Sequence, residues 1–169
     1  MVLAMFSTPA AAGQDAKGTP CKAEADFPAT PSQFDVDKTD EFDRAGRLKG
    51  REFVAPNQRL YLRIACFTPA DPTPITLERD KVIQVFFEST RKLGVFGQKY
   101  FFRHYPDRTY LTVTGTRKVN GKQFVVRMEQ HFFPLRTVSL VASYPEGDGN
   151  AFDLATAFFE SFRASRLGS

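Results

Sequence analysis

The chain has 169 residues, of which 42% are hydrophobic and 25% are charged, and its formal net charge is +4. This length fits one domain with a single core, and a mean hydropathy of -0.32 argues against an integral membrane protein. The densest basic segment, residues 44–51, is flanked by Asp43 and Glu52 and has no helix-turn-helix or base-stacking pattern. We therefore expect no nucleic-acid partner.

The first segment, MVLAMFSTPAAAG, is uncharged and ends in small residues, like the tail of a secretory signal peptide. Because the basic part is missing and the apolar part is short, we expect the natural start upstream, or Met1 as an internal start, with cleavage after Ala12. Residues 1–12 are then a signal-peptide remnant and the protein is periplasmic or secreted, whereas the alternative is a disordered cytosolic tail. No other stretch has the roughly 18 apolar residues of a membrane span, so the protein is not expected to be membrane-embedded.

The two cysteines, Cys21 and Cys66, also indicate in which compartment the protein resides. An even pair in an exported chain is a candidate disulfide, and this one would tie the N-terminal arm to a strand. Such a bond raises the free energy of unfolding by about 3–4 kcal/mol when its effect is calculated from the lost entropy of the unfolded chain. The alternative is two unpaired small hydrophobic residues, because the sequence does not give the distance between their Cα atoms.

Residues 13–33 contain Gly, Pro and Ala without periodicity and are predicted to form an extended arm or linker. The single folded domain is expected over residues 34–164, followed by a short tail at 165–169. Its 18 Phe and 5 Tyr, without any Trp, indicate a core of large rings, and a ligand cleft lined by rings is the alternative.

The first half of the domain is predicted to contain strands and one helix. Residues 59–66 alternate apolar and polar side chains as a half-buried strand does, and short strands at 34–36 and 52–54 are predicted to pair. Thr76 as an N-cap and Gly94 after the last turn predict a helix over 76–93. Its predicted buried stripe consists of Val82, Ile83, Phe86, Phe87 and Leu93.

The second half is predicted to be a run of strands followed by a helix. The strands are expected at 99–105, 108–118, 123–133 and 136–144. Short turns such as Asn120-Gly121 make them antiparallel. One face of the third strand would bury Phe124, Val126, Met128 and Phe132, with Arg127, Glu129 and His131 on the other. The final helix, 151–164 with Asn150 as its cap, has an apolar side of Phe152, Ala155, Phe158, Phe159 and Phe162.

These elements predict an α+β fold with a twisted antiparallel sheet of about six strands and two main helices. Their order, with the Tyr144-Pro145 strand end, the turn at 146–150 and the helix sequence AFFESF at 157–162, resembles the Mog1/PsbP-like α/β/α sandwich over residues 34–164. In bacteria that group includes many small exported proteins and lipoproteins of unassigned role. The resemblance implies the sandwich fold, and no functional residue of the family maps onto this chain.

No residue pattern predicts catalysis, a metal ion or a cofactor. Ser139 and Ser143 lack a nucleophile elbow, and His104 and His131 each lie alone in a strand. The cysteines and histidines also lack the close spacing of a metal site. We therefore expect a non-enzymatic protein with no cofactor.

Two functional hypotheses remain. The first is an extracytoplasmic binding or accessory module that docks to an unidentified envelope protein through Tyr61, Tyr100 and Phe102, which are predicted to lie opposite the helix-covered face. The second is a small-molecule or lipid-binding protein, in which the Phe-rich space between helix and sheet is partly hollow and takes a small hydrophobic ligand.

Overall fold

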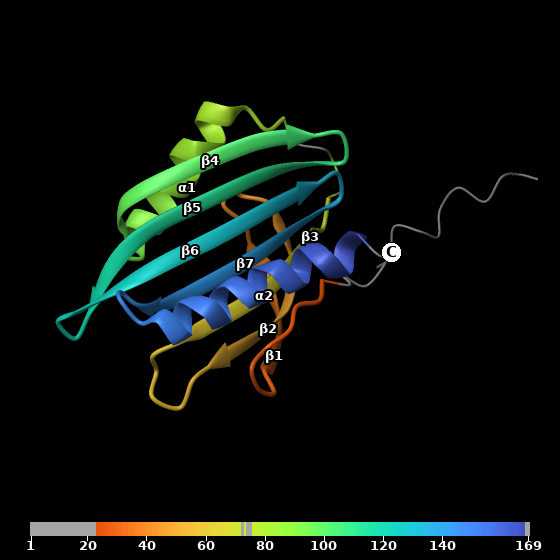
Figure 1. Ribbon diagram of the computed structural model, residues 1–169. Helices are drawn as coiled ribbons and strands as arrows, with labels where there is room; N and C mark the ends of the chain where they lie inside the picture. Colours follow the sequence, from red (N-terminus) through yellow and green to blue (C-terminus); the bar gives the residue numbers. More distant parts are fainter. Residues whose placement is uncertain (1–22, 72, 74–75, 168–169) are drawn as a thin grey trace, which may run out of the picture.

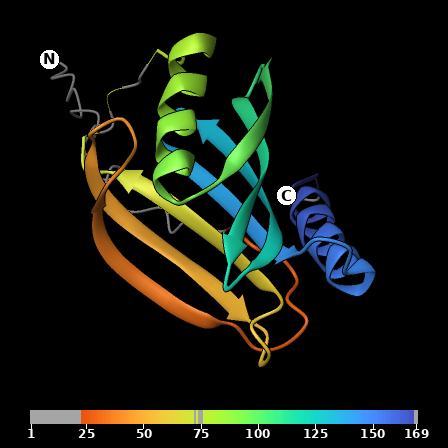
Figure 2. The ribbon, with the colours of Figure 1, turned by 90° about the vertical axis from the view of Figure 1, so that its left-hand side faces the viewer.

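The computed structural model describes residues 23–71, 73 and 76–167, with side chains described as far as Phe162. In chain order the elements are β1 (Ser32–Thr39), β2 (Ala45–Val54), β3 (Tyr61–Pro69), α1 (Arg79–Lys92), β4 (Phe96–Tyr105), β5 (Arg108–Val119), β6 (Lys122–Phe133), β7 (Arg136–Pro145) and α2 (Gly149–Leu167). The strands form one antiparallel sheet in the order β1-β2-β3-β7-β6-β5-β4. The two helices lie on opposite faces of it (Figure 1, Figure 2).

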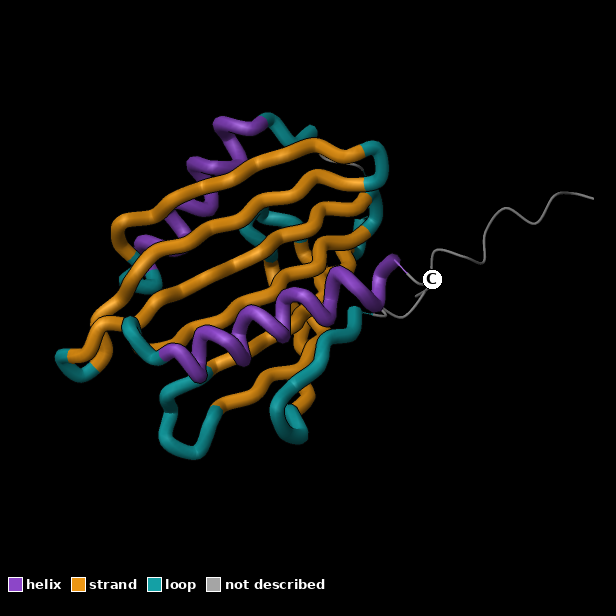
Figure 3. The backbone as a smooth tube through the Cα atoms, viewed as in Figure 1, coloured by secondary structure: helices purple, strands orange, loops and turns teal. Residues whose placement is uncertain are grey.

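The predicted α+β class with two helices is confirmed, but the sheet has seven strands instead of about six. The strands are long and their connections are short, apart from the segment that carries α1 (Figure 3). Within the described residues, no helix has the length and apolar character needed to cross a membrane.

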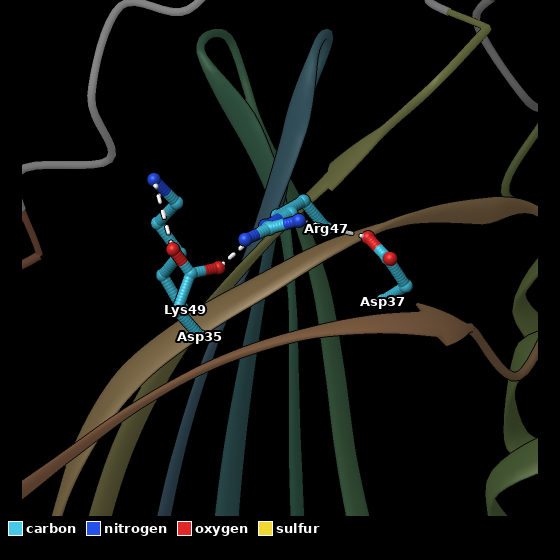
Figure 4. Close-up of polar contacts among 4 residues, drawn as sticks. All are labelled: Asp35, Asp37, Arg47 and Lys49. Atoms are coloured by element: carbon cyan, nitrogen blue, oxygen red, sulfur yellow. Dashed lines mark hydrogen bonds and ion pairs between the residues drawn. The ribbon is translucent and has the colours of Figure 1, made fainter.

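The charged segment 44–51 is mostly strand β2, whereas the sequence predicted only short strands at 34–36 and 52–54. Its side chains pair with β1 across the ladder: Arg47 lies 2.5 Å from Asp35 and 3.1 Å from Asp37, and Lys49 lies 3.3 Å from Asp35 (Figure 4). Arg47, and then Lys49, lower the pKa of Asp35 because they stabilise its charged form. Opposite charges directly across an edge pair explain why so polar a sequence forms a strand.

Helix α1 is shorter than predicted and buries a narrower stripe. It begins at Arg79 after Glu78, which forms no side-chain cap, so Thr76 is not the N-cap. Val82 and Phe86 are buried as predicted, whereas Phe87 and Leu93 are 41% and 65% exposed. The helix packs on β4, β5, β6 and Phe42, and Phe87 and Leu93 lie outside this cluster.

Helix α2 covers the opposite face, over β3 and β7. Its first turn is capped by Asp148, whose Oδ1 accepts a hydrogen bond from the Ala151 amide at 3.2 Å, and Asn150 lies inside the helix. Phe158 and Phe159 are buried as predicted, but Phe152 is exposed and contacts Tyr144 by its edge.

The described part of the N-terminal arm packs against α2. The Phe27 and Phe158 ring centroids are 5.1 Å apart, and the Asp26 amide donates a hydrogen bond to Ser161 Oγ at 2.9 Å. Cys66 is buried in the core on this same face. Cys21 and Ala12 lie outside the described residues, so the Cys21–Cys66 disulfide and the cleavage site stay predictions.

A charged cluster on β6 is buried beneath α2. The alternation predicted for this strand is correct, but Glu129 and His131 are inaccessible to solvent. The Arg127 guanidinium lies 2.7 Å from Glu129 Oε1 and 4.2 Å from the centroid of Phe159, and His131 Nε2 lies 3.6 Å from Glu129 Oε2. The charge of Glu129 is thus balanced inside the core, where an unpaired carboxylate would be costly.

We predict that Glu129→Gln lowers the free energy of unfolding by about 3 kcal/mol, because it leaves the Arg127 charge in a partly buried site without its counter-charge. Urea denaturation followed by circular dichroism measures this loss. The matched control is Asp35→Asn in the exposed cross-strand network, which should leave the urea midpoint unchanged. Equal effects of the two substitutions would show that the buried pair has no special role.

Candidate functional site: a groove on the α1 face

A cavity of about 430 Å³ lies on the sheet face that carries α1, between the end of that helix and the β1–β2 hairpin. Figure 2 shows β1 and β2 curling toward the side of the sheet on which α1 lies. Strand register arranges the floor in rows: Leu48, Phe67, Thr137 and Phe132; Ala65, Ser139 and Gln130; Arg63, Val141 and Met128; and Tyr61, Ser143 and Val126. We call this cavity the groove.

Small side chains on the central strands leave the groove open. Ala65, Ser139 and Ser143 occupy floor positions that α1 does not cover. Near the end of α1, Val95 lies against Gly115 of β5, where an added Cβ would come 2.7 Å from Val95 Cγ1. Gly115 therefore lets the chain that follows α1 lie close to the sheet and form one wall of the groove.

One end of the groove is closed by the tip of the β1–β2 hairpin. The ring of Phe42 packs edge-on against Phe86 of α1 and Phe132 of β6, with centroids 6.4 and 6.0 Å apart. Asp40 shapes this tip, because its Oδ1 accepts hydrogen bonds from the amides of Phe42 and Arg44 at 3.0 and 2.9 Å. Its Oδ2 lies 2.6 Å from the Arg44 guanidinium, so the tip is held by one largely buried carboxylate.

The opposite end is polar. Tyr61 donates a hydrogen bond to Glu52 Oε2 at 3.2 Å, and burial raises the pKa of Tyr61 above its ordinary value. Arg63 stacks on the ring of Phe34, with its guanidinium carbon 4.5 Å from the centroid. Ser143 and Arg117 line the same end from β7 and β5. This end therefore combines hydroxyl and guanidinium donors.

The sequence-predicted docking residues do not form one surface. Tyr61 lines the groove, but Tyr100 and Phe102 on β4 are half-buried against α1. The prediction that these two lie opposite the helix-covered face is wrong, because α1 covers the face to which they point. A docking role for the three residues stays a prediction.

Among the described residues, the groove brings together no set that resembles a catalytic or metal site. Its serines lie without a histidine, since His131 faces α2 and His104 on β4 contacts Thr109 Oγ1 at 2.8 Å. Ser139 Oγ instead accepts a hydrogen bond from Gln130 Nε2 at 2.8 Å. No cluster of metal-ligating side chains occurs in the part of the chain that the structure describes. The arrangement fits binding by shape and hydrogen bonds.

The position of the groove was not predicted from the sequence. A sequence signal does exist on β7, where Thr137, Ser139 and Ser143 alternate with apolar residues that face α2. That alternation is also typical of a strand with one solvated face, so it does not by itself indicate a cavity.

No family model and no curated protein matches the chain. Among solved structures it is similar to LpqN, involved in cell envelope biogenesis of Mycobacterium tuberculosis, with a TM-score of 0.46 and 17% identity. The match covers 79% of this chain and 83% of that chain. A likeness at this level assigns no function to the groove, and the Mog1/PsbP-like resemblance stays a prediction.

We predict that Asp40→Ala loosens the closed end of the groove, because it removes the acceptor of two backbone amides and the ion pair with Arg44. Amide hydrogen exchange at Phe42 and Arg44 should become at least tenfold faster, while exchange in β6 should not change. The matched control, Asp37→Ala on the exposed side of β1, should leave both rates unaltered. Unchanged exchange at Phe42 in the Asp40 variant would contradict this account of the tip.

Proposed function

We propose that the protein is a non-enzymatic, extracytoplasmic binding protein that holds a small ligand in the groove. The observation that carries the proposal is the groove itself: about 430 Å³ lies within the range of roughly 300–1,000 Å³ typical of small-molecule sites. Its lining combines apolar side chains with a few polar groups, the combination that gives a ligand both affinity and orientation.

The geometry favours this function over docking of an envelope protein. Of the three residues proposed for docking, Tyr100 and Phe102 are partly covered by α1, and Tyr61 faces into the groove. All three residues are partly buried, and they do not lie together on one surface that a protein partner could cover.

We predict that native mass spectrometry of the protein purified from its own host detects a bound small molecule, and that Val141→Trp abolishes it. Val141 lies in the groove floor between Arg63 and Met128, so an indole there fills the cavity without removing a polar group. The matched control is Val119→Trp, at an exposed position of β5 outside the groove, which should retain the ligand.

Thermal unfolding and circular dichroism would establish that both variants are folded. If the Val141 variant does not fold, Ser139→Phe fills the neighbouring row of the floor and serves the same purpose. The proposal is wrong if the wild-type protein carries no ligand and binds none of a set of amphipathic test compounds.

The extracytoplasmic part of the proposal rests on the N-terminal sequence and the cysteine pair. For protein expressed with its natural upstream codons, we predict a chain that begins near Gly13 and gains two hydrogens on reduction. Intact-mass spectrometry with and without reductant measures both. A full-length chain with two free thiols would instead direct the ligand search to the cytosol.

A further inference from the structure

We infer that the ligand of the groove is an anionic amphiphile, whose carboxylate or phosphate is held by Arg117 and Ser143 while its hydrocarbon part extends toward Phe42. This inference rests on the proposed function, since it names the class of ligand that the same groove takes. Three observations support it. Arg117 and Ser143 offer unpaired hydrogen-bond donors at the polar end, Arg117 has no carboxylate partner there, and apolar side chains line much of the rest of the groove.

Arg117 is the first of these donors. Its side chain lines the groove, and its Nε is buried without a hydrogen-bond partner among the described residues. Arg117 also forms no ion pair with a carboxylate among the described residues. A guanidinium in this state presents fixed donors that match the oxygen atoms of a carboxylate or phosphate.

Ser143 supplies a second donor at the same end. It is only 3% exposed, and its Oγ has no hydrogen-bond partner within the described part of the chain. Register places Ser143 beside Val126 on β6, which in turn pairs with Gly115, the residue two positions before Arg117 on the same strand face. A buried hydroxyl without a partner is costly in a folded protein unless something else satisfies it.

The charges around the groove favour an anion at this end. Arg63 adds a second guanidinium, stacked on Phe34 in the side wall. Glu52 is not part of the lining, but it lies opposite Arg63 in the β2–β3 register and accepts the hydrogen bond of Tyr61, so it offsets the charge of Arg63. At the closed end, Asp40 is neutralised by Arg44. Glu41 also lines the closed end, so the attraction of the polar end for an anion rests on Arg117, which forms no ion pair with a carboxylate among the described residues.

The remainder of the groove suits a hydrocarbon chain. From the polar end toward Phe42, the lining includes Val126, Met128, Val141 and Phe132, with Ser139 and Gln130, which are hydrogen-bonded to each other, before the last of them. Their rows follow the strands, so an extended chain lying along β6 and β7 contacts them in turn. Leu93 stands exposed beside the polar end and provides further apolar surface where a ligand enters.

The test uses isothermal titration calorimetry of the delipidated, full-length protein with decanoate, decyl phosphate and decanol. We expect either or both anions to bind at least tenfold more tightly than decanol, and their ratio distinguishes a carboxylate from a phosphate ligand. The Arg117→Met variant keeps an apolar stem but removes the charge, so it should lose this preference and retain the affinity for decanol. Ser143→Ala should weaken anion binding severalfold.

The matched control is Lys118→Met, which removes one positive charge at the next, exposed position of β5, on the opposite face of the strand. It should keep the preference for anions. If decanol binds as tightly as the anions, or if Arg117→Met keeps the preference, the anion inference is wrong while the binding groove stands. If no compound binds to the wild-type protein, the inference fails, and an absence of co-purified ligand would remove the groove proposal as well.

Discussion

The in-register pairing of β3 with β7 and of β7 with β6 is the constraint on which both the core and the groove depend. Because successive side chains of a strand point to opposite faces, this register sends Leu62 and Leu140 toward α2 and sends Arg63 and Val141 into the groove. A slip of one residue would bury Arg63 under α2 and expose Leu62. The apolar core beneath α2 therefore fixes the positions of the groove residues on the other face.

Elements whose formation depends on local patterns could be predicted from the sequence. The alternation around Leu62, the Asn120-Gly121 turn and the apolar side of α2 each follow from a short stretch of chain, and they lie where they were expected, with Phe152 as the exception. Strand β2 did not follow from such a pattern. Its charges lie opposite those of β1, and the ion pairs between the strands exist only once both are aligned.

The candidate site was beyond prediction because it depends on contacts between distant segments. Phe42 lies in a charged stretch and resembles a solvent-exposed residue, yet its ring meets α1 and β6, some 44 and 90 positions further along the chain. Likewise, the burial of Glu129 follows from the place where α2 docks. A sequence pattern gives the face to which a side chain points, but not what covers that face.

The two faces of β7 differ in a way that suits the proposed amphipathic ligand. Toward α2 the strand presents Val138, Leu140, Ala142 and Tyr144, which are buried in the core. Toward the groove it presents Thr137, Ser139, Val141 and Ser143. Helix α1 does not cover this face of β7, which is left to the groove. On this face hydroxyl groups lie beside apolar side chains. Water would leave the apolar side chains exposed, and a fully apolar molecule would leave the hydroxyl groups without hydrogen-bond partners. An amphipathic ligand meets both requirements, because its polar group satisfies the donors at one end while its apolar part removes the remaining surface from water.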